Sequence, residues 1–158
     1  MADLGWGKTS RPLAIVLGTL LGVLWGAFGS FGYLQFVKDA NILEMSLFRL
    51  FMAVAGALVA VLEDCITRGL VMNELQRMGS SKLVQVLASS VLFSLYHSIW
   101  RFNMISFTVG LIYGLMLSGL FVLGRRSLTP VILGHGLALL LGEPFLTMSL
   151  LQAIKLGR

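Results

Sequence analysis

Residues 63–69 read Glu-Asp-Cys-Ile-Thr-Arg-Gly, and this short polar stretch lies inside one of the most apolar regions of the chain. Residues 50–62 contain no charge, and the apolar run resumes at residues 70–72. A charge at membrane depth costs about 2.5–3.5 kcal/mol on insertion scales unless it is paired or faces a cavity. The three charged side chains of this stretch therefore need partners inside the fold.

The composition around this stretch is that of a membrane protein. The chain is 57% hydrophobic and only 12% charged, and its mean hydropathy is +0.89. A soluble domain carries about 25% charged residues. We therefore expect a single integral membrane domain over residues 1–158, with an all-α, polytopic fold of five to six transmembrane helices. The net charge of +5 is spread between apolar runs, which favours loop placement and predicts no nucleic-acid partner.

Apolar runs of about 20 residues predict the helices that cross the bilayer. Residues 145–154 are apolar but short, so they predict a partial sixth span, a re-entrant segment or an interfacial helix. Ser127 is a candidate N-cap for the fifth helix, and Pro130 suits its first turn. The five predicted helices cover residues 12–36, 45–75, 83–100, 104–124 and 128–142.

Basic residues between these helices predict the orientation of the chain. If the N-terminus is cytoplasmic, the outer side receives Lys38, Arg49 and Arg101. This asymmetry fits the positive-inside rule, so we expect a multi-pass protein with its N-terminus in the cytoplasm. The inner side then receives Lys8, Arg11, Arg77, Lys82, Arg125 and Arg126.

Small residues recur at four-residue spacing in two of the predicted helices. Such rows let helices approach closely, and we expect packing within one chain rather than a dimer interface. The rows are Gly18, Gly22, Gly26 and Ser30 in the first helix, and Gly110, Gly114 and Ser118 in the fourth.

Helical geometry divides the roles of the polar stretch. Asp64 and Arg68 are four residues apart, which places them on one face and suits a structural ion pair. Glu63 points about 100° away from Asp64, so it remains able to face a cavity. Cys65 points to the side opposite Glu63, and we expect it to be a packing residue rather than a nucleophile.

The chain has two histidines, His97 and His135, and they lie in different predicted helices. Together with Glu63 they can bind a divalent metal such as zinc, as a His₂Glu set with an open fourth position. Alternatively, Glu63 acts as a general base on water, His97 shares that water and His135 stabilises the oxyanion. A third possibility is a buried ionic network that only joins helices. The spacing leaves all three open.

Three segments resemble, in order, the motifs EExxxR, FxxxH and HxxxN of the CPBP (CAAX protease and bacteriocin-processing) intramembrane protease family. They are Glu63-Asp64-x-x-x-Arg68, Phe93-x-x-x-His97, and the segment of residues 127–135 that ends at His135. The resemblance covers residues 54–142 as a CPBP-like core. It implies that Glu63 activates water, that His97 assists and that His135 supports the oxyanion.

The resemblance predicts an intramembrane endopeptidase, metal-dependent or glutamate-based, that hydrolyses a peptide bond in a membrane-associated peptide or protein tail. The family's prenyl-CAAX endopeptidases remove a C-terminal tripeptide, and its bacterial members include self-immunity and peptide-processing proteins. Two positions depart from the motifs. Asp64 replaces a glutamate, and Leu139 replaces the asparagine expected four residues after His135. Because leucine donates no hydrogen bond, the alternative is an inactive CPBP-fold protein that serves as a structural or assembly subunit beside a stable membrane-protein partner.

Overall fold

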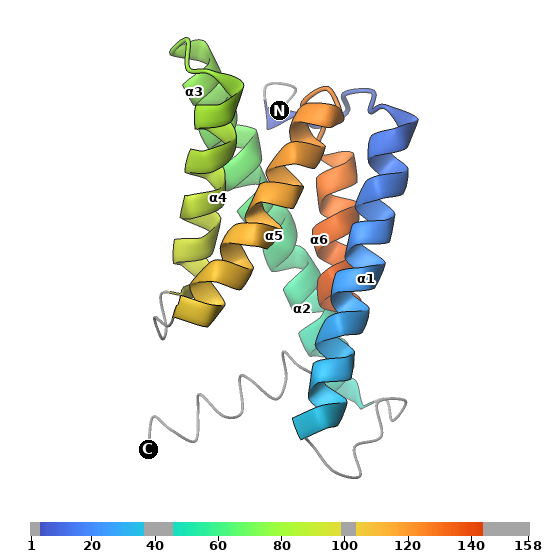
Figure 1. Cartoon of the computed structure of the whole chain (residues 1–158). Coiled ribbons are helices and arrows are strands. Elements are labelled where there is room, and N and C mark those ends of the chain that lie inside the picture. The colour runs from blue at the N-terminus through green and yellow to red at the C-terminus, as the bar shows by residue number, and fades with distance from the viewer. Residues whose placement is uncertain (1–3, 37–45, 99–103, 144–158) are drawn as a thin grey trace.

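A computed structural model of the chain describes residues 4–36, 46–98 and 104–143, and within these ranges it contains helices and no strand (Figure 1). The elements lie close to the predicted positions, and α1 has the predicted bounds. They are α1 (Pro12–Phe36), α2 (Leu47–Asp64), the π-helical segment η2 (Cys65–Met72), α3 (Asn73–Arg77), α4 (Lys82–Ser98), α5 (Met104–Leu123) and α6 (Thr129–Leu141).

Three helical segments are long and apolar enough to cross a membrane: Pro12–Gly32, Leu47–Arg77 and Met104–Leu123. Thr129–Leu141 is a shorter apolar helix. This confirms the predicted all-α, polytopic membrane protein. The predicted sixth segment, residues 145–154, lies outside the described residues.

The glycine row of α1 packs against α6 within the same chain, as predicted. Gly18 lies against Pro130, and a Cβ atom added to Gly22 would be 2.5 Å from the carbonyl oxygen of Gly134. At the far end of the contact, the Ser30 hydroxyl donates a hydrogen bond to a carbonyl of α6. Only residues without large side chains allow this approach, which places α1 directly against the helix that carries His135.

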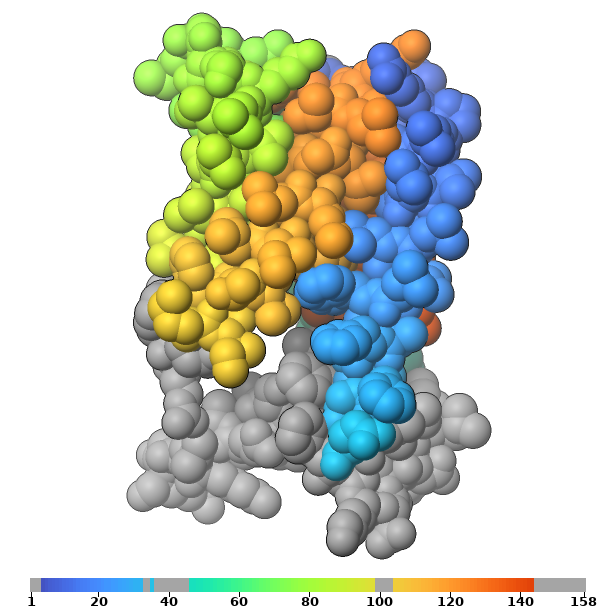
Figure 2. Space-filling view, viewed as in Figure 1, coloured from blue at the N-terminus to red at the C-terminus, as the bar shows by residue number. Residues whose placement is uncertain are grey.

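The second small-residue row brings α5 against α4. A Cβ atom added to Gly114 would be 3.1 Å from the Cα atom of Ser90, and the Ser118 hydroxyl donates to the Ser89 hydroxyl at 3.2 Å. The space-filling view shows α5 between α4 and α1 (Figure 2). The buried hydroxyl groups satisfy one another, so they can join two helices in apolar surroundings.

The helix that contains the polar stretch changes its winding directly after Asp64. A regular helix was predicted there, but residues 65–72 form a π-helix. The Thr67 hydroxyl donates to the carbonyl of Glu63 at 2.6 Å, and the Asn73 amide donates to the carbonyl of Gly69 at 2.5 Å. These side chains bond one carbonyl group just before the wider turns and one within them. Short π-helical segments are frequent at functional sites.

The connection between α5 and α6 is tied back to this helix by Arg126. Arg126 and its neighbour Arg125 both adopt positive φ angles, 61° and 59°, which non-glycine residues rarely do. The Arg126 guanidinium donates to the side chains of Asn73 and Gln85 at 2.7 and 2.8 Å, and to the carbonyl of Met72 at 2.6 Å. Three hydrogen bonds therefore offset the backbone strain.

The predicted N-cap of α6 is displaced by one residue. Leu128 is the cap residue and makes no side-chain cap. Ser127 instead accepts a hydrogen bond from the backbone N–H of Thr129 at 3.3 Å. Because α6 begins at Thr129, Ser127 lies one residue before the N-cap position.

Candidate functional site

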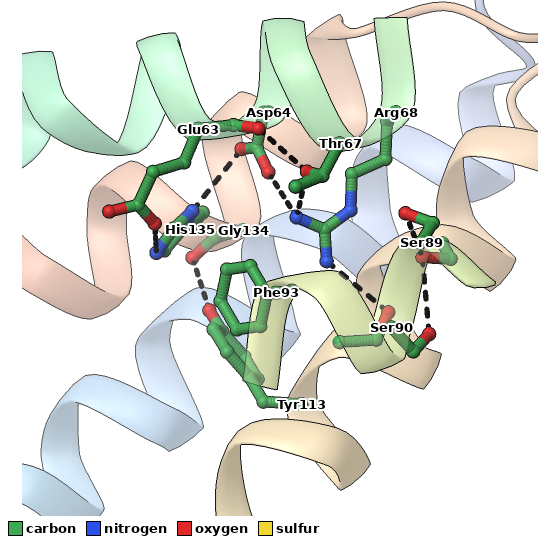
Figure 3. Close-up of polar contacts among 12 residues, drawn as sticks. Glu63, Asp64, Thr67, Arg68, Ser89, Ser90, Phe93, Tyr113, Gly134 and His135 are labelled. Carbon is green, nitrogen blue, oxygen red and sulfur yellow. Dashed lines mark hydrogen bonds and ion pairs between the residues drawn. The ribbon is translucent and has the colours of Figure 1, made fainter. Parts of the chain in front are cut away.

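Glu63, His97 and His135 converge from three helices, α2, α4 and α6. The Oε2 atom of Glu63 lies 3.8 Å from the Nε2 atom of each histidine. One ligand atom from each of the three residues lies within 4.8 Å of the other two. The close-up shows the Glu63 carboxylate turned towards His135 (Figure 3).

Asp64 contacts two partners, of which sequence reasoning identified one. Its Oδ1 atom accepts from Arg68 at 2.9 Å, and its Oδ2 atom faces Nδ1 of His135 at 3.3 Å. Asp64 and Arg68 are fully buried, and the His135 side chain is 1% exposed. The ion pair therefore also orients an imidazole of the site, much as a carboxylate orients the histidine of a catalytic triad.

Arg68 points away from the Glu63 carboxylate and into the core. Its guanidinium donates to the Thr67 hydroxyl at 2.7 Å and to the carbonyl of Gly114 at 3.3 Å. Its Cζ atom lies 4.4 Å from the centre of the Phe93 ring, a cation–π distance. The centre of the Phe93 ring also lies 4.2 Å from that of the His97 ring, so Phe93 packs against both Arg68 and this imidazole.

The hydrogen bonds of the two histidines define which ring nitrogens carry protons. Nδ1 of His97 lies 3.0 Å from the carbonyl of Phe93, and a carbonyl can only accept, so this nitrogen donates. Asp64 is paired with an arginine and therefore accepts from Nδ1 of His135. In the neutral form of each imidazole, the lone pair of its Nε2 atom is then directed towards Glu63.

Three acceptors thus meet at one point. The Oε2 atom of Glu63 is buried and has no hydrogen-bond partner among the described residues. Two lone pairs and a carboxylate repel one another unless a water molecule or a cation lies between them. A water that donates both hydrogens satisfies two of the acceptors, and a divalent cation satisfies all three.

The ligand types fit a hydrolytic zinc site. A tetrahedral zinc ion holds its ligand atoms about 3.4 Å apart, given bond lengths of about 2.0–2.1 Å. The observed separations from Glu63 are 3.8 Å, so a bound ion would draw the side chains together slightly. The Asp64 carboxylate faces Nδ1 of His135. Metal-bound histidines commonly have such a hydrogen-bond partner on the ring nitrogen that does not bind the metal.

A cleft of about 320 Å³ leads to Glu63 between the α2–η2 helix and α4. Glu63 is the one charged residue among the residues that line it. The His97 side chain is 36% exposed, so the site is open on the α4 side. The lining residues are Val59, Leu62, Glu63, Ile66, Thr67, Leu92, Phe93 and Tyr96.

Two residues singled out by the sequence lie apart from this chemistry. Cys65 packs against the hydrophobic core and offers its thiol to neither histidine in the described contacts, in agreement with the predicted packing role. Leu139 is half-buried on α6, one turn beyond His135, and its apolar side chain gives the site no donor.

One residue of the site had no sequence signal. Tyr96 lines the cleft together with Glu63, and its ring packs edge-on against His97 with centroids 5.6 Å apart. A tyrosine in an apolar helix resembles any other aromatic packing residue until the packing of α4 against α2 is known.

A comparison with protein families finds one model that matches residues 45–141, more than half of the chain, described as type II CAAX prenyl endopeptidase Rce1-like. The match runs from the start of α2 to the end of α6 and includes all three converging residues. No curated protein and no solved structure matches the chain.

Proposed function

Because the chain belongs to the type II CAAX prenyl endopeptidase Rce1-like family, we propose that it is an intramembrane endopeptidase that hydrolyses a peptide bond in a membrane-associated peptide or protein tail. The convergence of a buried carboxylate and the Nε2 atoms of two imidazoles on one point carries this proposal. A purely structural network would pair donors with acceptors there. An arrangement of acceptors alone suits a water molecule that is to be deprotonated.

In this mechanism Glu63 is the general base. Its Oε2 atom has no hydrogen-bond partner among the described residues and so can accept a hydrogen from water. His97 accepts the second hydrogen and orients the water. The proton taken up by Glu63 then passes to the leaving amine.

His135 supports the oxyanion in the form in which its Nε2 atom carries a proton, because that N–H can donate a hydrogen bond to the carbonyl oxygen. The Asp64 carboxylate at Nδ1, 3.3 Å away, stabilises the imidazolium that forms. Arg68, Asp64, His135 and Glu63 thus form one chain of contacts from the core to the site.

Zinc or another divalent cation, when bound, would polarise the scissile carbonyl and lower the proton affinity of water. Glu63, His97 and His135 would hold it. A chelation experiment separates the two forms of the mechanism. Cleavage that chelator abolishes and zinc restores assigns the metal form, whereas cleavage that chelator leaves unchanged assigns the glutamate-based form.

The cleft favours a substrate that approaches from the bilayer. Its walls are apolar, and two of its lining side chains, Leu62 and Ile66, are 63% and 54% exposed. In a membrane such side chains contact lipid. The apolar anchor of a substrate can therefore enter the cleft laterally from the bilayer, and the peptide bond next to this anchor can then reach Glu63.

The positions of the basic residues support a cytoplasmic N-terminus. The start of α1, the turn between α3 and α4, and the connection between α5 and α6 lie at the same end of the molecule (Figure 1). All six basic residues assigned to the inner side occur in these segments. We therefore propose that this end faces the cytoplasm.

The second candidate function is a structural or assembly subunit without protease activity. Leu139 favours it, because this position faces the same side of α6 as His135 and supplies no donor. Such a protein would hold a stable membrane-protein partner and would retain the fold of the family without its chemistry.

One experiment decides between the two functions. The full chain and its Glu63→Gln variant are reconstituted in vesicles with a membrane-anchored peptide reporter that ends in a prenylated CAAX sequence. The proposal predicts cleavage by the parent and none by the variant. A stoichiometric partner that co-purifies with both proteins, with no cleavage by either, would establish the subunit function instead.

A further inference from the structure

His135 lies between two glycines, Gly134 and Gly136, in the interior of α6. Glycine restrains the backbone less than any other residue and weakens a helix interior. The imidazole whose Nε2 atom lies 3.8 Å from Glu63 is therefore carried by a stretch of backbone that does little by itself to hold it in place. A restraint from outside α6 is needed.

Tyr113 of α5 supplies such a restraint on the backbone. Its hydroxyl donates a hydrogen bond to the carbonyl of Gly134 at 3.1 Å (Figure 3). In a regular α-helix that carbonyl also accepts from the backbone N–H four residues later, and a carbonyl oxygen has two lone pairs for the two bonds. The phenol thus adds a bond directly before His135 without replacing a bond of the helix.

The ring of Tyr113 also restrains the imidazole itself. It packs edge-on against His135, with centroids 5.8 Å apart, and the Phe93 ring does the same at 5.3 Å. Edge-to-face arrangements of this kind are favourable. Asp64 lies 3.3 Å from Nδ1 of His135. Two aromatic rings and a carboxylate therefore limit the rotation of this imidazole.

Tyr113 is in turn held by α1. The Trp25 ring stacks on it with centroids 4.4 Å apart and an angle of 14° between the planes. Tyr113 is buried, and the residues that line the described cleft do not include it. Its effect on a substrate bound in this cleft must therefore pass through His135.

We propose that Tyr113 is a positioning residue, which offsets the flexibility of the Gly134–Gly136 segment and so holds the His135 imidazole at Glu63. Its importance for catalysis rests on the proposed endopeptidase function. The restraint on His135 can be measured without any cleavage.

The first test is NMR of the full chain in lipid nanodiscs, with isotope labels in the histidine rings. The chain has two histidines, and a His97→Gln variant identifies which signals belong to which ring. Tyr113→Phe removes the hydroxyl but keeps the aromatic ring, and the Gly134 carbonyl keeps its helix bond, so the variant should fold. We expect the signals of His135 to shift or broaden and those of His97 to change much less.

Ser118→Ala is the matched control. It removes another buried hydroxyl of α5, which donates to Ser89 of α4 at 3.2 Å, and it should leave the signals of both histidines unchanged. Signals of His135 that stay the same in Tyr113→Phe, or that change equally in Ser118→Ala, would overturn the proposal.

Gly136→Ala provides a rescue that a merely structural role of Tyr113 does not predict. A Cβ atom at this position would meet no atom within 4 Å, and alanine restrains the helix more than glycine does. The double variant Tyr113→Phe/Gly136→Ala should return the signals of His135 towards those of the parent. A double variant as disturbed as Tyr113→Phe alone would reject flexibility as the property that Tyr113 offsets.

Kinetics of reporter cleavage test the catalytic consequence. Tyr113→Phe is expected to lower kcat by up to about 10²-fold with little change in KM, because a misplacement of about 1 Å at a reacting group can cost that much. An unchanged kcat would reject the positioning role and keep the endopeptidase. A parent that cleaves no reporter, with NMR signals that respond as expected, would reject the endopeptidase and keep the restraint on His135.

Discussion

Two adjacent carboxylates, Glu63 and Asp64, have opposite surroundings. Asp64 is fully buried and contacts both Arg68 and His135, whereas the Oε2 atom of Glu63 has no hydrogen-bond partner in the described part of the chain. The difference follows from helix geometry, because neighbouring residues point about 100° apart. One carboxylate can thus complete the fold while the other remains available for chemistry.

This division predicts unequal effects on folding. Arg68→Ala leaves Asp64 without its cation in the core, and breaking a buried pair costs about 3–5 kcal/mol. Glu63→Ala removes a charge that has no such partner. We therefore expect much less folded protein from Arg68→Ala, measured as the monodisperse fraction extracted from membranes. Equal accumulation of the two variants would contradict the structural assignment of Arg68.

Position 139 offers a gain-of-function prediction. An asparagine there would add a donor one helical turn from His135 and on the same face. Leu139→Asn is expected to raise the turnover of the reporter by as much as about 10²-fold, the usual worth of one such donor. Leu139→Met is the control, because it keeps the volume and adds no donor. Turnover that rises equally in both variants would remove the hydrogen-bond explanation.

Sequence reasoning located the main site residues because so few polar groups interrupt the apolar helices. Glu63, His97 and His135 stand out for that reason alone. The contact of Asp64 with His135 did not follow from the sequence, since it depends on how α2 packs against α6. The position of Tyr96 in the wall of the cleft was missed for the same reason, because it depends on the packing of α4.

At the scale of the elements, α1 lies outside the segment that matches the family, yet it is closely packed against α6. The glycine row predicted this close contact, though not which helix would be the partner. Gly134, the residue of α6 that α1 meets at Gly22, directly precedes His135. The position of a site residue thus depends on a helix that the family match does not include.

A methyl group at this contact should therefore disturb both stability and the site. The Cβ atom of Gly22→Ala would lie 2.5 Å from the Gly134 carbonyl oxygen, and overpacking costs about 1–3 kcal/mol. We expect a lower thermal midpoint in detergent and reduced cleavage. Gly29→Ala is the control, because its Cβ atom would meet one atom at an ordinary 3.6 Å. Equal midpoints for the two variants would show that α1 can move away without cost.

The winding of η2 was beyond sequence reasoning for a different reason. Residues 65–72 carry no proline or other residue that requires a π-helix. The wider turns coincide with side-chain bonds to the backbone from Thr67 and Asn73 and with two bonds from Arg126, to Asn73 and to the carbonyl of Met72. Two of these residues are adjacent to the segment or within it, but Arg126 reaches it from a distant connection. Regular helix was the natural expectation without those tertiary bonds.

At the scale of the whole molecule, apolar helices surround a polar interior. Large side chains on α1, such as Leu24 and Phe28, are 68% and 70% exposed, as expected for lipid contact. The charged chain from Arg68 to His135 is buried. The polar site is therefore buried where bulk water is scarce. In the described part of the chain, the cleft beside α4 leads to this site.

The central claim is that Glu63 and His97 act on one water molecule, and a double-mutant cycle tests it most directly. His97 suits the cycle because its side chain is 36% exposed and its hydrogen bond to the Phe93 carbonyl stays within α4, so truncation should spare the fold. Single-turnover cleavage is measured for the parent, Glu63→Gln, His97→Ala and the double variant. Residues that act as a unit give non-additive losses, so the double variant should be no slower than Glu63→Gln. Losses that multiply, or either single variant cleaving at the parent's rate, would contradict a shared water.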